Sequence, residues 1–308
     1  MSEQIPAEFK SGFVAVVGRP NVGKSTLMNR FLGQKIAAVS PRPQTTRRRQ
    51  LGILTLPQAQ MVFVDTPGIH KPVHKLGEYM NQVALDALRD ADVVLWLVDA
   101  SVKPTDEDRL CAQRILEALG QNPANVLLAL NKMDQVPEDQ RAGRLKGYQD
   151  LLSSAWVVWI SATSGAGTQD LLDEILRRLP EGPPYYEEEQ ITDLYEREIA
   201  ADLIREAALI HLKDEVPHAI AVRIDEYKER SEDTAYIAAT LLLERESHKP
   251  IVIGKGGEML KRIGTTARLE IESMSGRKVF LDLRVKVMEN WRDNPALLRS
   301  LGYVVRKD

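Results

Sequence analysis

Cysteine is almost absent from this chain of 308 residues, which contains a single one, Cys111. One cysteine cannot form an internal disulfide, and a chain without disulfides is typical of a reducing compartment. We expect Cys111 to be a half-buried thiol without a chemical role, because free cysteines usually behave as small hydrophobic residues.

Long hydrophobic runs are also missing. The longest apolar segments, such as 93–98, are far shorter than the roughly 20 residues that a membrane-spanning helix needs. Residues 1–11 include Glu and Lys and no apolar run, so we expect no signal peptide there. These absences predict a cytoplasmic protein.

The chain has little net charge, with 41 Lys and Arg against 44 Asp and Glu, a balance of −3. No global basic field points to nucleic acid, so any basic patch must be local. The length exceeds that of a typical single domain, and a hydrophobic content of 44% is enough for two cores. The composition therefore favours two soluble globular domains.

The first 180 residues alternate short apolar runs with amphipathic stretches of helical length, such as 76–89 and 106–119. This alternation predicts an α/β domain with a mostly parallel sheet, in which ligands bind at the carboxyl ends of the strands. The predicted strands are 13–17, 61–64, 93–98, 126–130 and 157–160.

The pattern stops at the proline-rich segment 180–184, which predicts a linker because proline cannot continue a helix. We therefore predict two domains, 1–180 and 185–308. The second has a different rhythm, in the order helix, strand, strand, helix, helix, strand, and belongs to the α+β class. The segments are 193–212, 220–224, 236–243, a helical piece before the glycine-rich turn 254–257, a helix over 259–271, and 279–287.

A glycine-rich motif follows the first strand and precedes the helical segment that begins at Thr26. It matches the phosphate-binding pattern G-x-x-x-x-G-K-[ST] in its required context of strand, loop and helix. Backbone N–H groups and the helix amino terminus attract phosphate, while Lys24 can reach the β- and γ-phosphates and Ser25 can ligate Mg²⁺. The motif is Gly18-Arg19-Pro20-Asn21-Val22-Gly23-Lys24-Ser25.

The second motif, Asp65-Thr66-Pro67-Gly68, directly follows the predicted strand 61–64. Asp65 sits where a carboxylate would hold Mg²⁺, and the Gly68 N–H can reach a γ-phosphate. The pattern is common by chance, so its weight comes from its place at the end of a strand in a phosphate-binding domain.

The third motif, Asn131-Lys132-Met133-Asp134, predicts which nucleotide base the site binds. An aspartate carboxylate accepts hydrogen bonds from the N1–H and 2-amino groups of guanine, and adenine has neither donor. A site that leaves a carboxylate unpaired against the wrong base discriminates strongly. Ser161 and Ala162 follow the next strand, and their backbone can contact the guanine O6.

The polar segment between Gly33 and Leu51 is where a switch segment belongs in such a domain. A threonine there ligates Mg²⁺ only when the γ-phosphate is present. We choose Thr46, with Thr45 as the close alternative. The arginine run 47–49 is either a solvated loop or a contact with RNA or the ribosome.

Three further motifs join the three already given: Gln44-Thr45-Thr46-Arg47, Val252-Ile253-Gly254-Lys255-Gly256-Gly257 and Leu298-Arg299-Ser300-Leu301-Gly302-Tyr303. Together the six motifs resemble those of the Era family of bacterial GTPases, and the resemblance covers essentially the whole chain. The phosphate-binding motif and the motifs at 44–47, 65–68 and 131–134 are shared by many GTPases, and their combination with the motifs at 252–257 and 298–303 is specific to Era-like proteins.

The resemblance implies a P-loop GTPase domain followed by a smaller type II KH domain. Era family members are small-subunit assembly factors whose KH domain holds the 3′ end of 16S rRNA, and some associate with the inner face of the membrane. It implies GTP and GDP as ligands, Mg²⁺ as cofactor, and a monomer. Related GTPases suggest K⁺ as a candidate second ion, held with the help of Asn21. Ile69 stands where Ras-type GTPases carry a water-orienting glutamine, which implies slow intrinsic hydrolysis.

The glycine-rich turn 254–257 matches the G-x-x-G loop of a KH module, which clamps the RNA backbone. Residues 245–286 contain ten Lys and Arg against five Asp and Glu, a local excess typical of a phosphate-binding face. We expect bases to be bound in an apolar groove formed by Ile251, Val252, Ile253 and Ile263. The predicted RNA-binding residues are Gly254, Lys255, Gly256, Gly257, Lys261, Arg262 and Arg268.

The sequence thus predicts one nucleotide site and one RNA site. We assign Lys24, Thr46 and Gly68 to catalysis and Ser25, Thr46 and Asp65 to Mg²⁺. One competing function is a membrane-associated signalling GTPase whose second domain recruits proteins, and the basic G-x-x-G region argues against it. Another is an RNA-modification enzyme, but the second half of the chain contains no methyltransferase motif and no candidate nucleophile. The predicted nucleotide-binding residues are 18–26, 65–69, 131–134, Ser161 and Ala162, so that Thr26 and Ile69 are included.

Overall fold

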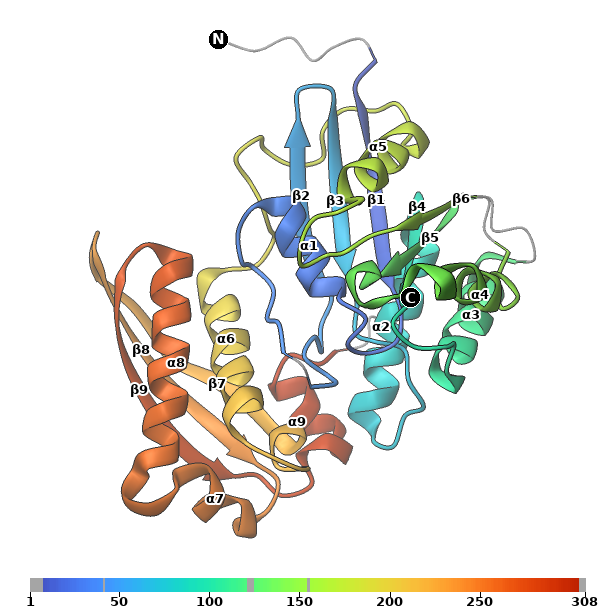
Figure 1. Cartoon of the computed structure of the whole chain (residues 1–308). Helices are drawn as coiled ribbons and strands as arrows, with labels where there is room; N and C mark the ends of the chain where they lie inside the picture. The colour runs from blue at the N-terminus through green and yellow to red at the C-terminus, as the bar shows by residue number, and fades with distance from the viewer. Residues whose placement is uncertain (1–7, 41, 121–124, 154–155, 305–308) are drawn as a thin grey trace. The chain divides into compact units, whose positions relative to one another are not determined.

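The computed structural model describes residues 8–40, 42–120, 125–153 and 156–304. Within these residues the chain forms two compact units, which Figure 1 shows in colours running along the chain. The first unit comprises 1–34, 46–71 and 80–193, and the second comprises 35–45, 72–79 and 194–308, except for the few residues outside the described ranges. The predicted bounds 1–180 and 185–308 stay predictions.

The first unit is built on a six-stranded sheet in the order β2-β3-β1-β4-β5-β6. All neighbouring pairs are parallel except β2 and β3, which are antiparallel. This confirms the predicted α/β class with a mostly parallel sheet. The strands are β1 (Lys10–Val17), β2 (Gln50–Leu56), β3 (Ala59–Asp65), β4 (Val93–Asp99), β5 (Val126–Asn131) and β6 (Trp156–Trp159).

The central strands are apolar throughout because helices cover both faces of a parallel sheet. Every residue of β3, β4 and β5 is buried. Ligand-binding loops can then leave only at the strand ends, where the predicted motifs lie. The helices are α1 (Lys24–Leu32), α2 (Lys75–Asp90), α3 (Asp106–Leu119), α4 (Glu138–Gln149) and α5 (Thr168–Arg178), with a 3₁₀ turn at Met133–Gln135.

Strand β2 is the one strand of this sheet that the sequence analysis did not predict. Its carboxyl-terminal residues are only half-buried, as expected at a sheet edge. It pairs antiparallel with β3 through a short turn, in a register that places Gln50 opposite Asp65. The predicted switch segment therefore ends where this edge strand begins.

The proline-rich segment after α5 packs on the first unit. The Ser11 hydroxyl donates to the carbonyl of Pro183 (2.7 Å), and the Gln60 side-chain oxygen accepts from the amides of Tyr185 and Tyr186 (2.7 and 2.9 Å). The Ile53 amide donates to the carbonyl of Ile191 (2.8 Å). These bonds explain why residues up to Asp193 belong to the first unit.

The second unit has a three-stranded sheet, β7-β8-β9, whose first pair is antiparallel and second pair parallel. Its order of elements is the predicted one, and its α+β class is confirmed. Figure 1 shows α6 and α8 side by side against this sheet, where their apolar faces form one core. The elements are α6 (Glu196–His211), β7 (Ile220–Ser231), β8 (Thr234–Leu243), α7 (Lys249–Ile253), α8 (Glu258–Ser275), β9 (Lys278–Val287) and α9 (Pro295–Ser300), with 3₁₀ turns at Pro217–Ala219, Glu246–His248, Lys255–Gly257 and Trp291–Asp293.

The segment 35–45 belongs to this second unit through charged contacts. Lys35 Nζ donates to both Glu206 of α6 and Glu270 of α8, at 2.8 Å each. Burial lowers the pKa of Lys35, but the bonds to the two glutamates outweigh it, so the pKa lies above its usual value. The buried Arg205 donates to the carbonyls of Gln44 and Thr45.

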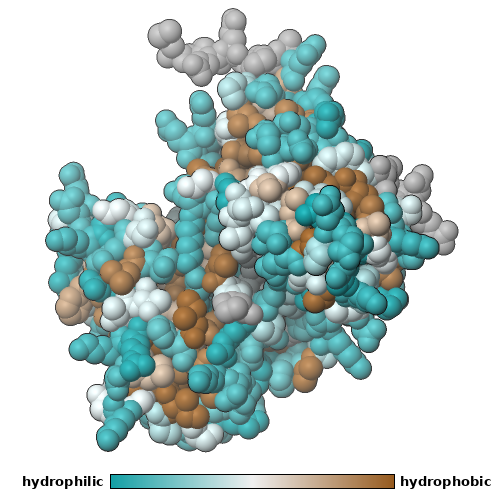
Figure 2. Space-filling model, viewed as in Figure 1, coloured by the Kyte–Doolittle hydropathy of each residue, from teal (hydrophilic) through white to brown (hydrophobic). Residues whose placement is uncertain are grey.

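Among the helices that the structure describes, none is long and apolar enough to cross a membrane. On the face drawn in Figure 2, hydrophobic residues form separate patches among hydrophilic ones. Cys111 is fully buried in the core of the first unit, rather than half-buried as predicted.

Candidate nucleotide and RNA sites

The phosphate loop connects β1 to α1 and is held in close contact with neighbouring backbone. A Cβ at Gly18 would lie 2.2 Å from the carbonyl oxygen of Leu97, and one at Gly68 would lie 2.5 Å from the backbone nitrogen of Pro20. Gly23 caps α1 at a φ of 101°, which favours glycine. The glycines of two predicted motifs are therefore required by how closely their loops pack.

Lys24 is buried within this loop. Its Nζ donates to the carbonyls of Gly18 (3.2 Å) and Arg19 (3.0 Å). Burial lowers the pKa of Lys24, and the neighbouring Asp65 partly offsets that effect. The loop thus carries a desolvated ammonium group, which strengthens its attraction for phosphate.

Three oxygen-bearing side chains from separate motifs meet beside the loop. Ser25 Oγ donates to Asp65 Oδ2 (2.7 Å), Thr46 Oγ1 donates to the same oxygen (3.1 Å), and the two hydroxyls are 3.0 Å apart. Thr45 instead donates to the carbonyl of Arg42 (2.8 Å). Hydroxyl and carboxylate oxygens are the ligands that Mg²⁺ prefers, so the donor set fits this ion. Of the two candidate threonines, Thr46 lies in the cluster.

The loop 131–134, which is the predicted base-recognition loop, is anchored by Asn131. Its side-chain amide donates to the carbonyl of Val22 (2.7 Å), and its Oδ1 accepts from the amide of Ala162 (2.9 Å). Asp134 is exposed, and its carboxylate has no hydrogen bond among the residues that the structure describes. The loop 131–134 is therefore fixed to the phosphate loop and to residues 161–162 while Asp134 points to solvent.

Several of the predicted nucleotide-binding residues have side chains that are buried inside the protein. Ile69 packs in the core of the first unit, and only its N–H, which donates to the Gly18 carbonyl (3.2 Å), reaches the phosphate loop. The Thr66 hydroxyl is bonded to the carbonyl of Val16 (2.8 Å). Val22 is fully buried. The side chains of these residues support the site, and only their backbone is available to a ligand.

Two carboxylates next to the site were not predicted. Arg19 forms ion pairs with Asp99 (3.4 Å) and Asp108 (3.3 Å), and Lys132 forms one with Asp99 (2.7 Å). Asp99 directly follows the predicted strand 93–98, so its position at a carboxyl strand end was a signal that could have identified it.

The G-x-x-G loop lies between α7 and α8 in the second unit. Gly254, Gly256 and Gly257 have φ angles of 75°, 61° and 83°, all in the region that favours glycine. Lys255 is exposed at the tip, and a Cβ at Gly256 would have nothing within 4 Å. The loop can therefore be approached closely by a nucleic-acid backbone.

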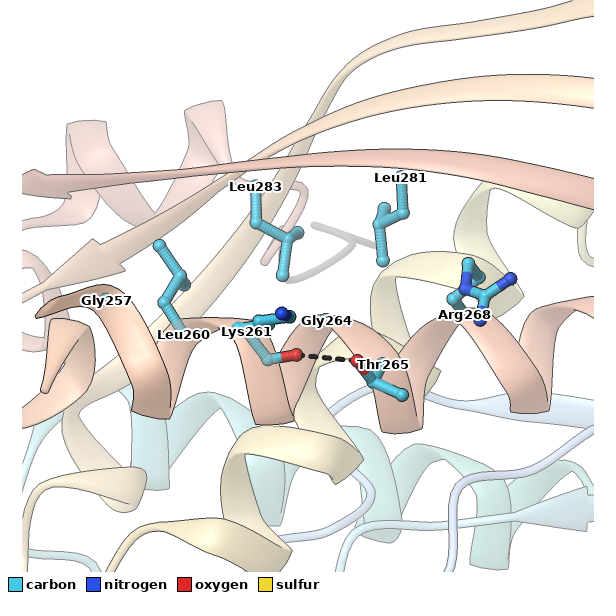
Figure 3. A pocket seen from close by; sticks show the side chains of 8 residues that line it. All are labelled: Gly257, Leu260, Lys261, Gly264, Thr265, Arg268, Leu281 and Leu283. Atoms are coloured by element: carbon cyan, nitrogen blue, oxygen red, sulfur yellow. Dashed lines mark hydrogen bonds between the residues drawn. The ribbon is translucent and has the colours of Figure 1, made fainter.

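A groove of about 370 Å³ begins at this loop and runs between α8 and β9. Figure 3 shows Leu281 and Leu283 of β9 pointing towards α8, from which Lys261 and Arg268 line the same groove. The groove thus combines apolar side chains with two cations. Its lining residues are Gly257, Leu260, Lys261, Gly264, Thr265, Arg268, Leu281 and Leu283.

The groove differs from the predicted one. Val252 and Ile263 are fully buried in the core, so they cannot contact a base. They face inward because they supply the apolar stripes by which α7 and α8 pack on the sheet. Arg262, a predicted RNA-binding residue, is exposed and paired with Glu258 on α8, and it does not line the groove.

Known proteins are similar to this chain in both units. Residues 13–132 match the family model described as 50S ribosome-binding GTPase, and residues 215–292 match that of the KH domain. GTPase Era of Geotalea uraniireducens is 48% identical over 296 residues, which cover 96% of this chain and 98% of the relative. GTPase Era of Clostridium botulinum is 50% identical, with the same coverage.

Two solved structures share the fold over nearly the whole length. One is the crystal structure of Era in complex with MgGDPNP and nucleotides 1506–1542 of 16S ribosomal RNA, with 40% identity and a TM-score of 0.90. The other is a variant of Aquifex aeolicus Era bound to GDP and AlF₄⁻, with the same identity and TM-score. Each match covers 96% of this chain and 100% of that chain. With identity and coverage of this extent, the chain belongs to the GTPase Era family.

Proposed function

We propose that this protein is a GTP-hydrolysing switch that binds the 3′ region of 16S rRNA and assists small ribosomal subunit assembly. The observation that carries the proposal is the likeness of 96% of this chain to an Era structure that holds a GTP analogue, Mg²⁺ and 16S rRNA nucleotides together. The Ser25, Thr46 and Asp65 cluster and the exposed G-x-x-G loop supply a site for each kind of ligand.

In the first unit, we assign each motif a role. The N–H groups of the phosphate loop and Lys24 bind the β- and γ-phosphates, and Gly68 meets the γ-phosphate through its N–H. Ser25, Thr46 and Asp65 would hold Mg²⁺, which neutralises charge on the phosphates when bound. Asp134 accepts hydrogen bonds from guanine, and the backbone of residues 161–162 contacts its O6.

Hydrolysis in this site is expected to be slow without a partner. The side chain of Ile69 is 1% exposed and lies in the core, so it cannot orient an attacking water.

We propose that K⁺ near Asn21, an exposed residue of the phosphate loop, contributes positive charge. Single-turnover rates in KCl and NaCl at equal ionic strength test this, and equal rates would exclude the potassium role.

In the second unit, the RNA backbone would lie on the loop 254–257, and bases would enter the groove between α8 and β9. Lys255 at the loop tip and Lys261 and Arg268 in the groove supply positive charge. Arg262 contributes charge from the exposed face of the same helix. The G-x-x-G loop of a KH module clamps the backbone of four nucleotides, which supports this placement of the RNA backbone.

Direct titration tests both halves of the proposal. The full-length protein should bind GTP and GDP but not ATP, and should retain a 16S 3′-end RNA in filter binding with strong salt dependence. An unrelated RNA of equal length is the control. Equal affinity for ATP, or equal retention of both RNAs, would contradict the assignment.

We also propose that the protein acts as a cytoplasmic monomer. Peripheral association with the inner face of the membrane, which the resemblance implies for some members, can be measured by flotation with anionic vesicles. Light scattering gives the oligomeric state. A stable dimer at micromolar concentration would exclude the monomer.

A further inference from the structure

A carboxylate outside the nucleotide motifs contacts two of them at once. Asp99 is the last residue of β4, and the pairing of β4 with β5 places it opposite Asn131. Its Oδ2 accepts from Lys132 Nζ (2.7 Å) and lies 3.4 Å from an Arg19 guanidinium nitrogen. One oxygen therefore contacts both the base-recognition loop and the phosphate loop.

The surroundings of Asp99 keep this carboxylate charged and oriented. Its side chain is only 9% exposed. Its other oxygen accepts from the amide (3.1 Å) and the hydroxyl (2.5 Å) of Ser101. Burial raises the pKa of Asp99, but the hydrogen bonds from Lys132 and Ser101 outweigh it and hold the pKa below its usual value. Asp99 therefore stays ionised at neutral pH.

A second carboxylate fixes the other side of Arg19. Asp108 is fully buried, and its Oδ2 accepts from the amide (2.8 Å) and hydroxyl (2.7 Å) of Thr105 in the capping box of α3. Arg19 Nε donates to the same oxygen (3.3 Å). Arg19 thus lies between one carboxylate held by a strand and one held by a helix terminus.

We propose that Asp99 is a positioning residue for the guanine nucleotide: it holds Lys132 close to Arg19 and so keeps the base-recognition loop in register with the phosphate loop. The proposal rests on the guanine-nucleotide function given above. Asp99 does not contact the reacting atoms. Its loss therefore shortens nucleotide retention and loosens base selection, and leaves the chemical step at saturating GTP unchanged.

The isosteric variant Asp99→Asn tests this in the full-length protein. Release of a fluorescent GDP analogue should become about ten-fold faster, the size typical of coupled charged residues. KM for GTP should rise while kcat is kept, and the ratio of GDP to inosine diphosphate affinity should shrink. Asp99→Glu, which keeps the charge, should restore much of the slow release. Asp106→Asn is the matched control, because Asp106 is exposed and its one ion pair within the described part of the chain is with Arg109 (3.6 Å).

A double-mutant cycle separates positioning from general stabilisation. If Asp99 acts through Lys132, then Asp99→Asn combined with Lys132→Met should release GDP no faster than Lys132→Met alone. Additive effects together with a lower melting temperature would overturn the proposal, as would wild-type release from Asp99→Asn. In either case the wild-type protein still binds GTP, so the guanine-nucleotide function is judged separately by its own titration.

Discussion

The hydroxyls of Ser25 and Thr46 lie 3.0 Å apart, although 21 residues separate them in the chain. Both also contact the same oxygen of Asp65. Ser25 is fixed by the first turn of α1, whereas Thr46 lies in a segment without regular structure. Thr46 is therefore the member of the cluster whose position can depend on the ligand.

Replacing Thr46 with valine keeps the shape and removes the hydroxyl. GTP turnover should fall on the order of a hundred-fold, as for other single preorganised polar groups, while GDP affinity changes little. Thr45→Val is the matched control because the Thr45 hydroxyl bonds to the Arg42 carbonyl. Single-turnover assays in Mg²⁺ measure both, and equal losses would contradict the choice of Thr46.

Asp134→Asn should move base preference from guanine towards xanthine, which carries an oxygen in place of the 2-amino group. Loss of two hydrogen bonds to a charged acceptor should weaken GTP binding by about 3 kcal/mol. Asp134 is exposed, so the melting temperature should not change. Titration with GTP and xanthosine triphosphate decides the matter, and an unchanged preference would rule out Asp134 as the base reader.

Ile69→Gln, which would imitate Ras-type GTPases, should not speed hydrolysis here. The side chain at this position is buried in the core, so the new amide would be desolvated at a cost of about 2–3 kcal/mol. We expect a lower melting temperature and no faster turnover. A stable and faster variant would show that the side chain can reach the nucleotide.

Gly256→Asp should abolish most RNA binding without unfolding the second unit. A Cβ at Gly256 meets nothing within 4 Å, and its φ of 61° is one that aspartate tolerates better than most residues. The new negative charge should weaken binding of a 16S 3′-end RNA about ten-fold or more. Gly276→Asp is the control, since Gly276 has a φ of 70° and equally open surroundings at the end of α8.

The single lysine of that loop should matter less. Lys255→Ala should lower the salt slope by less than one unit, since a single-strand phosphate contact contributes about −0.7. Filter binding over a salt series measures the slope for both variants. Normal RNA binding by folded Gly256→Asp would mean that the loop is an ordinary turn.

Cys111 should make stability fall at alkaline pH. Burial raises the pKa of its thiol to about 12. The folded protein therefore favours the protonated thiol. The resulting stabilisation is complete below the pKa of the thiol in the unfolded chain, about 8.5. It is lost as the pH rises towards the folded pKa of about 12. Denaturant unfolding of wild type and Cys111→Ala between pH 8 and 10 should show a steeper decline for wild type. Parallel curves would mean that the thiol is accessible.

The length and spacing of the apolar runs in the sequence predicted the buried strands well. Residues 93–98 and 126–130 are continuous apolar runs because helices cover both faces of the sheet. Strand β2 was not predicted because an edge strand mixes polar and apolar residues. Its extent is set by pairing with its partner β3. Local pattern carries no information on which strand will pair with such a segment.

The motifs likewise predicted that Ser25, Thr46 and Asp65 lie close together, but not how neighbouring side chains are oriented. Spacing could not separate Thr45 from Thr46, since adjacent residues in a loop have no fixed facing. The sequence analysis placed Val252 and Ile263 in an apolar groove, but both are buried in the core, and Leu281 and Leu283 line the groove that the structure contains. Only packing decides which of these apolar residues face the core.

The chain passes into the second unit twice before its carboxyl-terminal part begins, at 35–45 and at 72–79. Ile36, Ala37 and Ala38 are at most 5% exposed, and Lys35 is the cation shared by Glu206 and Glu270. A fragment starting at residue 194 would lack these residues, which would expose apolar surface and leave two neighbouring carboxylates without their lysine. Expressing residues 1–193 and 194–308 separately would therefore divide the second unit between two chains. Both fragments should be less soluble than the intact protein.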